Sequence, residues 1–273
     1  MSSGALFVPD RERWLPTDLA RGPWDPGALH GGPVAALAAR AAEVCEPDPA
    51  LEVARLSLEL LRPVPVAPLT VTARIARPGR KVQIVDVNVS DGDRHLAWGR
   101  VLRIRKLDPA SEAAAELASR DQSPAADEPG SQVPPGPDRA SASAPIAEGY
   151  KGFHNGGAEL LFSRGEFGKR GPATVWVRLA VPVVPEEEPS PLQRVAAAAD
   201  FGNGVSSVLD FTRWVFINPD VTVFLLRPMV GEWVCLQAAT QLGVPGIGLA
   251  RSTLWDRSGM VGHSVQSLLV EPR

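Results

Sequence analysis

Asp200 is the residue of this 273-residue sequence whose surroundings most strongly suggest chemistry. It follows four alanines, 196–199, at the end of an apolar helical segment. The C-terminal end of a helix carries the negative pole of its dipole, so an anion is unfavourable there. If it is partly buried, such a carboxylate acquires the raised pKa of a general base that can take a proton from water. The alternative is an aspartate on an exposed loop.

Gln266 and His30 are two further polar residues in positions that suggest a site. Gln266 lies in the largely apolar run 262–270, and if it faces inward its amide can orient a water molecule or bond an oxyanion. Because side chains alternate between the two faces of a strand, Gln266 could instead be an ordinary polar residue that faces outward. His30 precedes Gly31 and Gly32 at the start of a helical segment, where free backbone N–H groups can receive an anion or a carbonyl oxygen. A solvent-facing histidine is the alternative.

The elements that must position these residues occur in the same order in both halves of the sequence. An Ala-rich segment predicts a helix over 34–44, which Pro47 ends, and a second such segment predicts a helix over 192–200. Runs rich in β-branched and aromatic residues predict strands over 53–61, 69–75, 81–89 and 96–104, then over 159–162, 174–179, 221–226, 232–240, 248–255 and 262–270. The expected fold class is therefore α+β, with a mostly antiparallel sheet.

A Pro- and Ser-rich stretch separates the two halves. Residues 119–145 contain little apolar surface to offset the entropy of ordering, so we expect a flexible linker at 119–147 between units at 1–118 and 148–273. Arg62-Pro63 ends a predicted strand in the first unit, and Arg227-Pro228 does so in the second. The matching order of elements after each pair indicates a duplication.

Composition excludes several classes of function. A net charge of −3 offers no overall basic field for nucleic acid, and Cys45 and Cys235 are too few and too far apart for a disulfide framework. No histidine or cysteine spacing suggests a metal, and Gly31-Gly32 does not form the glycine pattern of a nicotinamide site, so no cofactor is expected. The sequence shows no leader segment and no apolar run of about 18 residues, and we expect a cytoplasmic protein without a membrane span.

Several short motifs, in this order, resemble the acyl-CoA thioesterase II family. They are Gly27-Ala-Leu-His-Gly-Gly-Pro33, Leu58-Glu-Leu-Leu-Arg-Pro-Val64, Asp200-Phe-Gly-Asn-Gly204, Phe216-Ile-Asn-Pro-Asp-Val-Thr222, Leu226-Arg-Pro228, Gly231-Glu-Trp-Val234 and Val265-Gln-Ser-Leu268. The resemblance covers nearly the whole chain except the linker. It implies a double hotdog, in which two curved antiparallel sheets each wrap around a central helix.

The resemblance also implies three catalytic positions that hold the hydrolytic water. Asp200 and Gln266 match the first and third, and Asn218 falls on the second, where better-known members have Ser or Thr. The amide of Asn218 offers both a donor and an acceptor in place of the hydroxyl. Thr222 is a nearby hydroxyl that strand alternation puts on the same face as Asn218, so it is the second choice for this position.

The leading functional hypothesis is hydrolysis of acyl-CoA thioesters by carboxylate-activated water. His30, Gly31, Gly32 and Thr222 are expected to contact the substrate, and Trp24 to line the acyl pocket. Two alternatives remain: a hotdog hydratase or dehydratase, which would need a histidine shortly after Asn218-Pro219 that this sequence lacks, and a non-catalytic binder of acyl-CoA or a lipid-like ligand. Acyl-CoA is the expected partner, and association through sheet edges is compatible with a homodimer.

Overall fold

The computed structural model describes residues 4–120, 132–142 and 151–273. The helices are α1 (Gly31–Val44), α2 (Glu112–Ala118), α3 (Pro191–Ala199) and α4 (Gly202–Val205), with short 3-10 turns at Asp18–Ala20, Pro137–Arg139 and Phe153–Asn155. The strands are β1 (Phe7–Asp10), β2 (Arg13–Pro16), β3 (Leu51–Leu60), β4 (Thr70–Arg77), β5 (Val82–Asp91), β6 (Arg94–Arg105), β7 (Ser141–Ala142), β8 (Ala158–Arg164), β9 (Ala173–Leu179), β10 (Trp214–Ile217), β11 (Asp220–Leu225), β12 (Val234–Gly243), β13 (Ile247–Asp256) and β14 (Gly259–Pro272).

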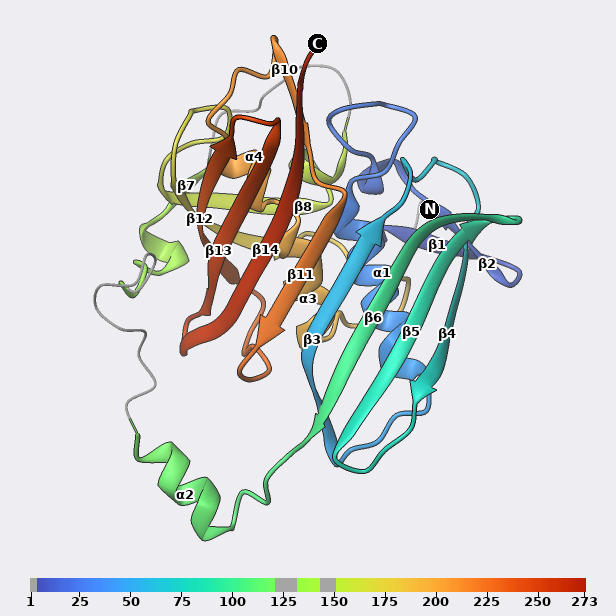
Figure 1. Ribbon diagram of the computed structural model, residues 1–273, viewed down its shortest axis with the longest axis vertical. Coiled ribbons are helices and arrows are strands. Elements are labelled where there is room, and N and C mark those ends of the chain that lie inside the picture. The colour runs from blue at the N-terminus through green and yellow to red at the C-terminus, as the bar shows by residue number, and fades with distance from the viewer. Residues whose placement is uncertain (1–3, 121–131, 143–150) are drawn as a thin grey trace.

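One antiparallel sheet of twelve strands runs through both halves of the chain (Figure 1). Its order is β4-β5-β6-β3-β11-β14-β13-β12-β9-β8-β7, and β10 pairs with β14 beside this path. All pairings are antiparallel, which confirms the mostly antiparallel sheet expected from the sequence. The sequence analysis missed the short strands β1, β2, β7 and β10, which are too brief to show a periodic pattern.

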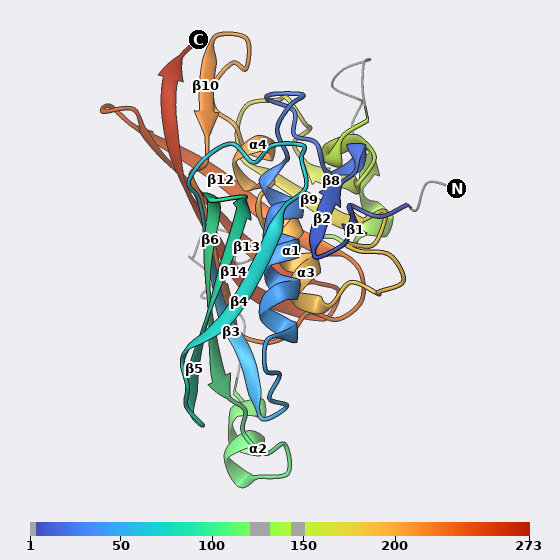
Figure 2. The same ribbon diagram turned by 90° about the vertical axis from the view of Figure 1, so that its right-hand side faces the viewer.

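The helices α1 and α3 lie on the same face of the sheet (Figure 2). Alanines dominate both helices and are almost fully buried, so the helices pack closely against each other and against the valines and leucines of the strands. The chain enters α1 through Gly31 and Gly32, which belong to the first helical turn rather than to the loop before it. The sequence therefore predicted both helices, although α1 begins three residues earlier than expected and α3 spans 191–199 instead of 192–200.

The two halves meet where β3 pairs with β11. The register is centred on Ser57 and Thr222, whose side-chain oxygens are 2.9 Å apart and whose positions differ by 165 residues. Arg62 and Arg227, the repeated residues of the sequence, have the same separation. Each residue pair on one side of Ser57 and Thr222 therefore has an equivalent pair on the other side, offset by the same 165 positions. This is the arrangement of a structure with an internal two-fold axis.

The region expected to be a linker is only partly described. Residues 121–131 and 143–150 lie outside the described residues, but 132–142 pack on the second half of the sheet. There β7 pairs with β8, and the Trp176 indole N–H donates to Pro135 O at 2.7 Å. Backbone groups, which composition does not report, thus hold residues 132–142 against the second half.

The repeated Arg-Pro pairs have different surroundings in the two halves. Arg227 makes two hydrogen bonds to the buried Asp256 carboxylate, at 2.6 and 2.7 Å, and a third to Gly259 O. No described carboxylate forms an ion pair with Arg62, which is exposed. Searched for membrane-spanning helices, the described residues contain none that is long and apolar enough.

This difference predicts unequal effects on stability. Arg227→Met leaves the Asp256 carboxylate buried without its cation, so we expect the free energy of unfolding to fall by about 2–3 kcal/mol. Arg62→Met, the matched control, is expected to change it by less than about 0.5 kcal/mol. Urea denaturation followed by circular dichroism measures both. Equal losses in the two variants would show that the Arg227 ion pair does not stabilise the fold.

Candidate active site

Asp200 ends α3, yet its carboxylate lies against the first turn of α1 in the other half of the chain. A Cβ atom at Gly31 would lie only 2.7 and 2.8 Å from the two carboxylate oxygens, so the helix can approach this closely only because residue 31 is glycine. The carboxylate, at the unfavourable end of its own helix, is thus at the favourable, positive end of α1. With 5% of its surface exposed, Asp200 is buried and not part of an exposed loop.

His30 is the closest polar neighbour of this carboxylate. Its Nδ1 is 2.7 Å from Asp200 Oδ2, and Gly32 N lies 3.1 Å from the same nitrogen. An ionised carboxylate can only accept hydrogen bonds, so Nδ1 must carry a hydrogen and donate a hydrogen bond to Asp200. The Gly32 N–H then donates to the Asp200 carboxylate as well. Phe153 and Phe201 pack on the imidazole at ring-centroid distances of 5.1 and 4.8 Å and fix its orientation.

Asn218 and Gln266 complete the cluster around Asp200. Asn218 Nδ2 donates to Asp200 Oδ1 at 2.8 Å and to Asp220 O at 3.1 Å, which leaves its carbonyl oxygen available. Gln266 Nε2 lies 3.3 Å from Asp200 O and 3.5 Å from Oδ1, and its Oε1 accepts the Asn203 N–H at 2.9 Å. The structure therefore brings together three residues that are 18 to 66 positions apart.

Two opposing effects set the pKa of Asp200. Burial raises the pKa of this carboxyl, but the charge of His30, the hydrogen bond from His30, and the N–H groups of Asn218 and Gly32 outweigh burial and hold the pKa below its ordinary value. The raised pKa expected from the sequence is therefore wrong. The sequence does not show that the positive end of another helix and a histidine would meet the carboxylate.

A cavity of about 350 Å³ opens beside the cluster and is formed by both halves of the chain. His30, Gly31, Asp200 and Asn218 line it, whereas Gln266, which is 1% exposed, lies behind them and bonds Asp200 and the Asn203 N–H. The remaining walls are mostly apolar. They include Leu29, Val34, Leu60, Leu61, Val64, Phe167, Phe201, Phe211, Ile217 and Leu269, together with residues 22–25 and 62–63.

The other residues predicted from the sequence have different positions. Trp24 lines the cavity, as expected, and packs against Phe211 and Phe216 at 5.2 and 5.1 Å. Thr222 does not reach it: the neighbouring Val221 and Val223 face the helices, so Thr222 points to the opposite face of the sheet, where it bonds Ser57. The expectation that Thr222 shares a face with Asn218 is wrong because β11 begins only at Asp220.

Sequence reasoning missed three residues that shape the site. Phe211 forms an aromatic wall with Trp24, and Phe153 orients His30 from the segment before β8, but neither lies in a recognisable motif. Asn203 lines the cavity and donates its backbone N–H to Gln266. Its place between Gly202 and Gly204 was the one signal available in the sequence. The structure explains the first glycine, because a Cβ at Gly202 would lie 2.6 Å from Gln266 Oε1.

A second junction between α1 and α3 lies at their opposite ends and has different polar residues. There Glu43, near the end of α1, accepts hydrogen bonds from Ser190 and Gln193 at the start of α3, at 2.6 and 2.9 Å. A smaller cavity of about 230 Å³ adjoins it. Val53 and Val101 occupy the positions that are 165 residues before Asn218 and Gln266. The polar groups described at this end are therefore Glu43, Ser190 and Gln193, with no counterpart of Asn218 or Gln266 at the equivalent positions.

Comparison with known families agrees with the site. Residues 20–104 match the acyl-CoA thioesterase N-terminal domain, and residues 120–270 match the acyl-CoA thioesterase C-terminal domain. The chain belongs to the acyl-CoA thioesterase family. This thioesterase is accordingly a thioester hydrolase. A comparison with curated proteins found no matching sequence.

Solved structures similar to this thioesterase show the hotdog fold. A hotdog-fold protein from Alicyclobacillus acidocaldarius has a TM-score of 0.72 and 14% identity, and the alignment covers 97% of this chain and 95% of that one. A candidate thioesterase II from Thermobifida fusca gives 0.70 and 18%, covering 98% and 96%. An acyl-CoA thioesterase II from Mycobacterium marinum gives 0.61 and 16%, covering 90% and 91%. At these identities the likeness concerns the fold.

The tight contact between Gly31 and Asp200 predicts the effect of one added methyl group. Gly31→Ala must push the carboxylate away from α1, so we expect thioester hydrolysis to fall by about 10²-fold, the typical loss for a misplaced catalytic group. Gly99→Ala is the matched control, because the nearest atom to its Cβ is a Leu58 methyl at 3.4 Å. Steady-state kinetics with an acyl-CoA, alongside thermal unfolding, separates the two variants. Undiminished activity of Gly31→Ala would contradict the role of this contact.

Proposed function

We propose that this thioesterase hydrolyses acyl-CoA esters to a free acid and CoA with a water molecule that Asp200 activates. The observation that carries the proposal is the buried Asp200 carboxylate, which His30 and Asn218 hold at the edge of a 350 Å³ cavity. Its lowered pKa keeps it ionised at neutral pH, so it is ready to accept a proton. Nothing in this mechanism requires a covalent intermediate.

Asn218 is proposed to orient the attacking water. Both N–H bonds of its amide are directed at protein oxygens, so its carbonyl oxygen can accept a hydrogen from a water that donates its other hydrogen to Asp200. A hydroxyl at this position could likewise accept from the water. The amide therefore replaces the Ser or Thr of better-known relatives without losing the acceptor that the reaction needs.

The first turn of α1 is proposed to bind the thioester carbonyl. Gly31 lines the cavity, and its backbone N–H belongs to the helical turn whose donors lack intrahelical partners. As the water oxygen attacks the carbonyl carbon, its proton passes to Asp200 and negative charge develops on the carbonyl oxygen. The carbonyl then re-forms as the C–S bond breaks, and the CoA thiolate leaves readily because a thiol pKa is about 8.5. The proton on Asp200 passes to the thiolate or to solvent, which restores the carboxylate.

Gln266 is proposed to act as a positioning residue. It reaches no part of the cavity wall, but it connects the Asp200 backbone to the Asn203 N–H and so fixes the turn that follows α3. His30 has a related function through its 2.7 Å contact with Asp200, besides lining the cavity. The acyl group would lie along Trp24, Phe211 and the leucines of the wall.

We further propose a double hotdog, with units at 1–118 and 148–273 joined by 119–147. The symmetric register of β3 with β11 about Ser57 and Thr222 supports it, as does the position of one long helix beside the strands of each half. A cytoplasmic location and a homodimer formed through sheet edges stay predictions from the sequence.

The mechanism predicts large losses when the cluster is changed. Asp200→Asn retains the shape of the side chain but removes the base, so kcat should fall by about 10²-fold to 10⁴-fold. Asn218→Ala should lower kcat by about 10²-fold through loss of the oriented water. Release of free CoA thiol measures both, and circular dichroism checks the fold. Asp200→Asn protein that hydrolyses thioesters at the normal rate would refute the mechanism.

The lowered pKa of Asp200 predicts a particular pH dependence. Activity should stay constant from neutral pH down to the ordinary carboxyl range, since the ionised form is lost only as pH falls through the lowered pKa. His30→Ala removes the charge and one of the donors that lower this pKa, so burial is opposed only by the N–H groups of Asn218 and Gly32. The acid limb of kcat/KM should then move to higher pH. His30→Asn, which keeps a donor without the charge, should give an intermediate shift.

A further inference from the structure

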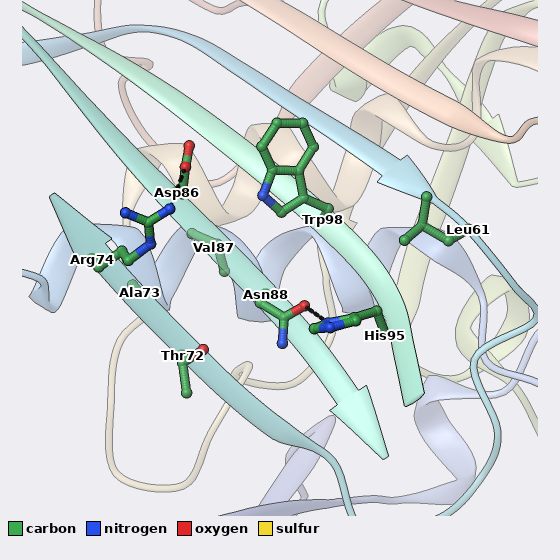
Figure 3. Close-up of a pocket in the computed structure, with 9 residues that line it drawn as sticks. All are labelled: Leu61, Thr72, Ala73, Arg74, Asp86, Val87, Asn88, His95 and Trp98. Atoms are coloured by element: carbon green, nitrogen blue, oxygen red, sulfur yellow. Dashed lines mark hydrogen bonds and ion pairs between the residues drawn. The ribbon is translucent and has the colours of Figure 1, made fainter. Parts of the chain in front are cut away.

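A second cavity, of about 400 Å³, lies on the face of the sheet opposite the helices, and we refer to it as the outer-face pocket (Figure 3). It is lined by Leu61, Thr72, Ala73, Arg74, Asp86, Val87, Asn88, His95 and Trp98. Two rows of paired residues cross β4, β5 and β6 at this pocket. Arg74, Asp86 and Arg100 are direct neighbours in one row, and Thr72, Asn88 and Trp98 in the other.

The outer-face pocket adjoins the 350 Å³ cavity beside Asp200, which we refer to as the catalytic cavity. Leu61 lines both. Figure 3 shows Leu61 at one end of the pocket and Arg74 with Asp86 at the other, with Trp98 between them. Arg62, next in the chain, lines the catalytic cavity and is exposed. A long ligand that leaves the catalytic cavity past Arg62 and Leu61 therefore enters the outer-face pocket.

The ion pairs leave one cation of the pocket available. Arg100 binds Asp86 with two nitrogens, at 2.7 and 3.1 Å, and also faces the negative charge of Glu59. Arg74 has a single 3.3 Å contact with Asp86, and its side chain is 74% exposed. The acidic groups are thus satisfied mainly by Arg100. The guanidinium of Arg74 retains donors for an anion such as a phosphate.

The polar and aromatic groups between the two cations suit a planar heterocycle. The Trp98 ring already has the Arg100 guanidinium 4.8 Å from its centroid, and such stacks bind aromatic bases well. The Asn88 carbonyl is held by His95 Nδ1 at 2.6 Å, which leaves the Asn88 amide N–H groups directed elsewhere. Thr72 adds a hydroxyl. A ligand that extends from the catalytic cavity would therefore meet the Arg62 cation first, then the Trp98 ring and Asn88 amide, and finally the Arg74 cation.

We infer that the outer-face pocket binds the nucleotide portion of the CoA substrate. This inference rests on the proposed function, in which the acyl group and the thioester occupy the catalytic cavity. Past the pantetheine arm, CoA carries a diphosphate and then an adenosine with a 3′-phosphate. Arg62 would meet the diphosphate, Trp98 and Asn88 the adenine, and Arg74 the 3′-phosphate. A chain with a net charge of −3 needs such local cations to hold a ligand with several negative charges.

The first experiment compares an acyl-CoA with the same acyl group on N-acetylcysteamine, which lacks the nucleotide. In Arg74→Ala, the ratio of kcat/KM for acyl-CoA to that for the truncated thioester should fall about tenfold through KM, the effect of one charged hydrogen bond. Arg74→Lys should restore part of the ratio. Arg251→Ala, which removes an exposed arginine from the outer face of β13 in the other half, is the matched control and should leave the ratio as in wild type.

The second experiment measures binding without turnover. Calorimetric titration of Asp200→Asn protein with adenosine 3′,5′-bisphosphate should show binding that weakens about tenfold when Arg74→Ala is added, and that high salt also weakens. If the wild-type protein hydrolyses neither thioester, the proposed function fails while the titration still reports on the pocket. Equal losses on both thioesters, or nucleotide affinity that does not depend on Arg74, would overturn the inference and leave the proposed function standing.

Discussion

The pairing of β3 with β11 about Ser57 and Thr222 is the contact on which the rest of the structure depends. It joins two half-sheets into one and brings α1 and α3 side by side in opposite directions on the same face. The end of each helix then meets the start of the other. Asp200 reaches the positive pole of α1 for this reason alone, because nothing local would bring a helix N-terminus to the C-terminus of α3.

Internal symmetry gives two such helix junctions, and side chains make them different. At one junction a short carboxylate, an amide and a buried glutamine surround a cavity of about 350 Å³. At the other, Glu43 bonds Ser190 and Gln193, and burial as the largest effect raises its pKa. Valines stand where amides would be needed. The two junctions thus share their helix geometry and differ in the polar side chains that surround the carboxylate.

The 350 Å³ cavity beside Asp200 and the outer-face pocket lie on opposite sides of the sheet, yet they meet at the end of β3. Leu61 belongs to both, and Arg62 next to it has no part in an internal ion pair like that of Arg227. The repeated arginine is therefore held by an ion pair in the second half and is exposed in the first. This division follows from Asp256, which has no structural counterpart in contact with Arg62 among the described residues.

The sequence by itself determined the order of the main strands and the two Ala-rich helices, and it singled out Asp200, Gln266 and His30, because these features depend on periodicity and on polar residues in apolar runs. It did not determine the pKa direction of Asp200, the face of Thr222, or the packing of residues 132–142. Each of these depends on partners distant in the chain: a helix pole and an imidazole, the start of a strand, and backbone bonds to β8. Only the tertiary structure could bring those groups together, since electrostatics and strand register act across space and leave no local pattern.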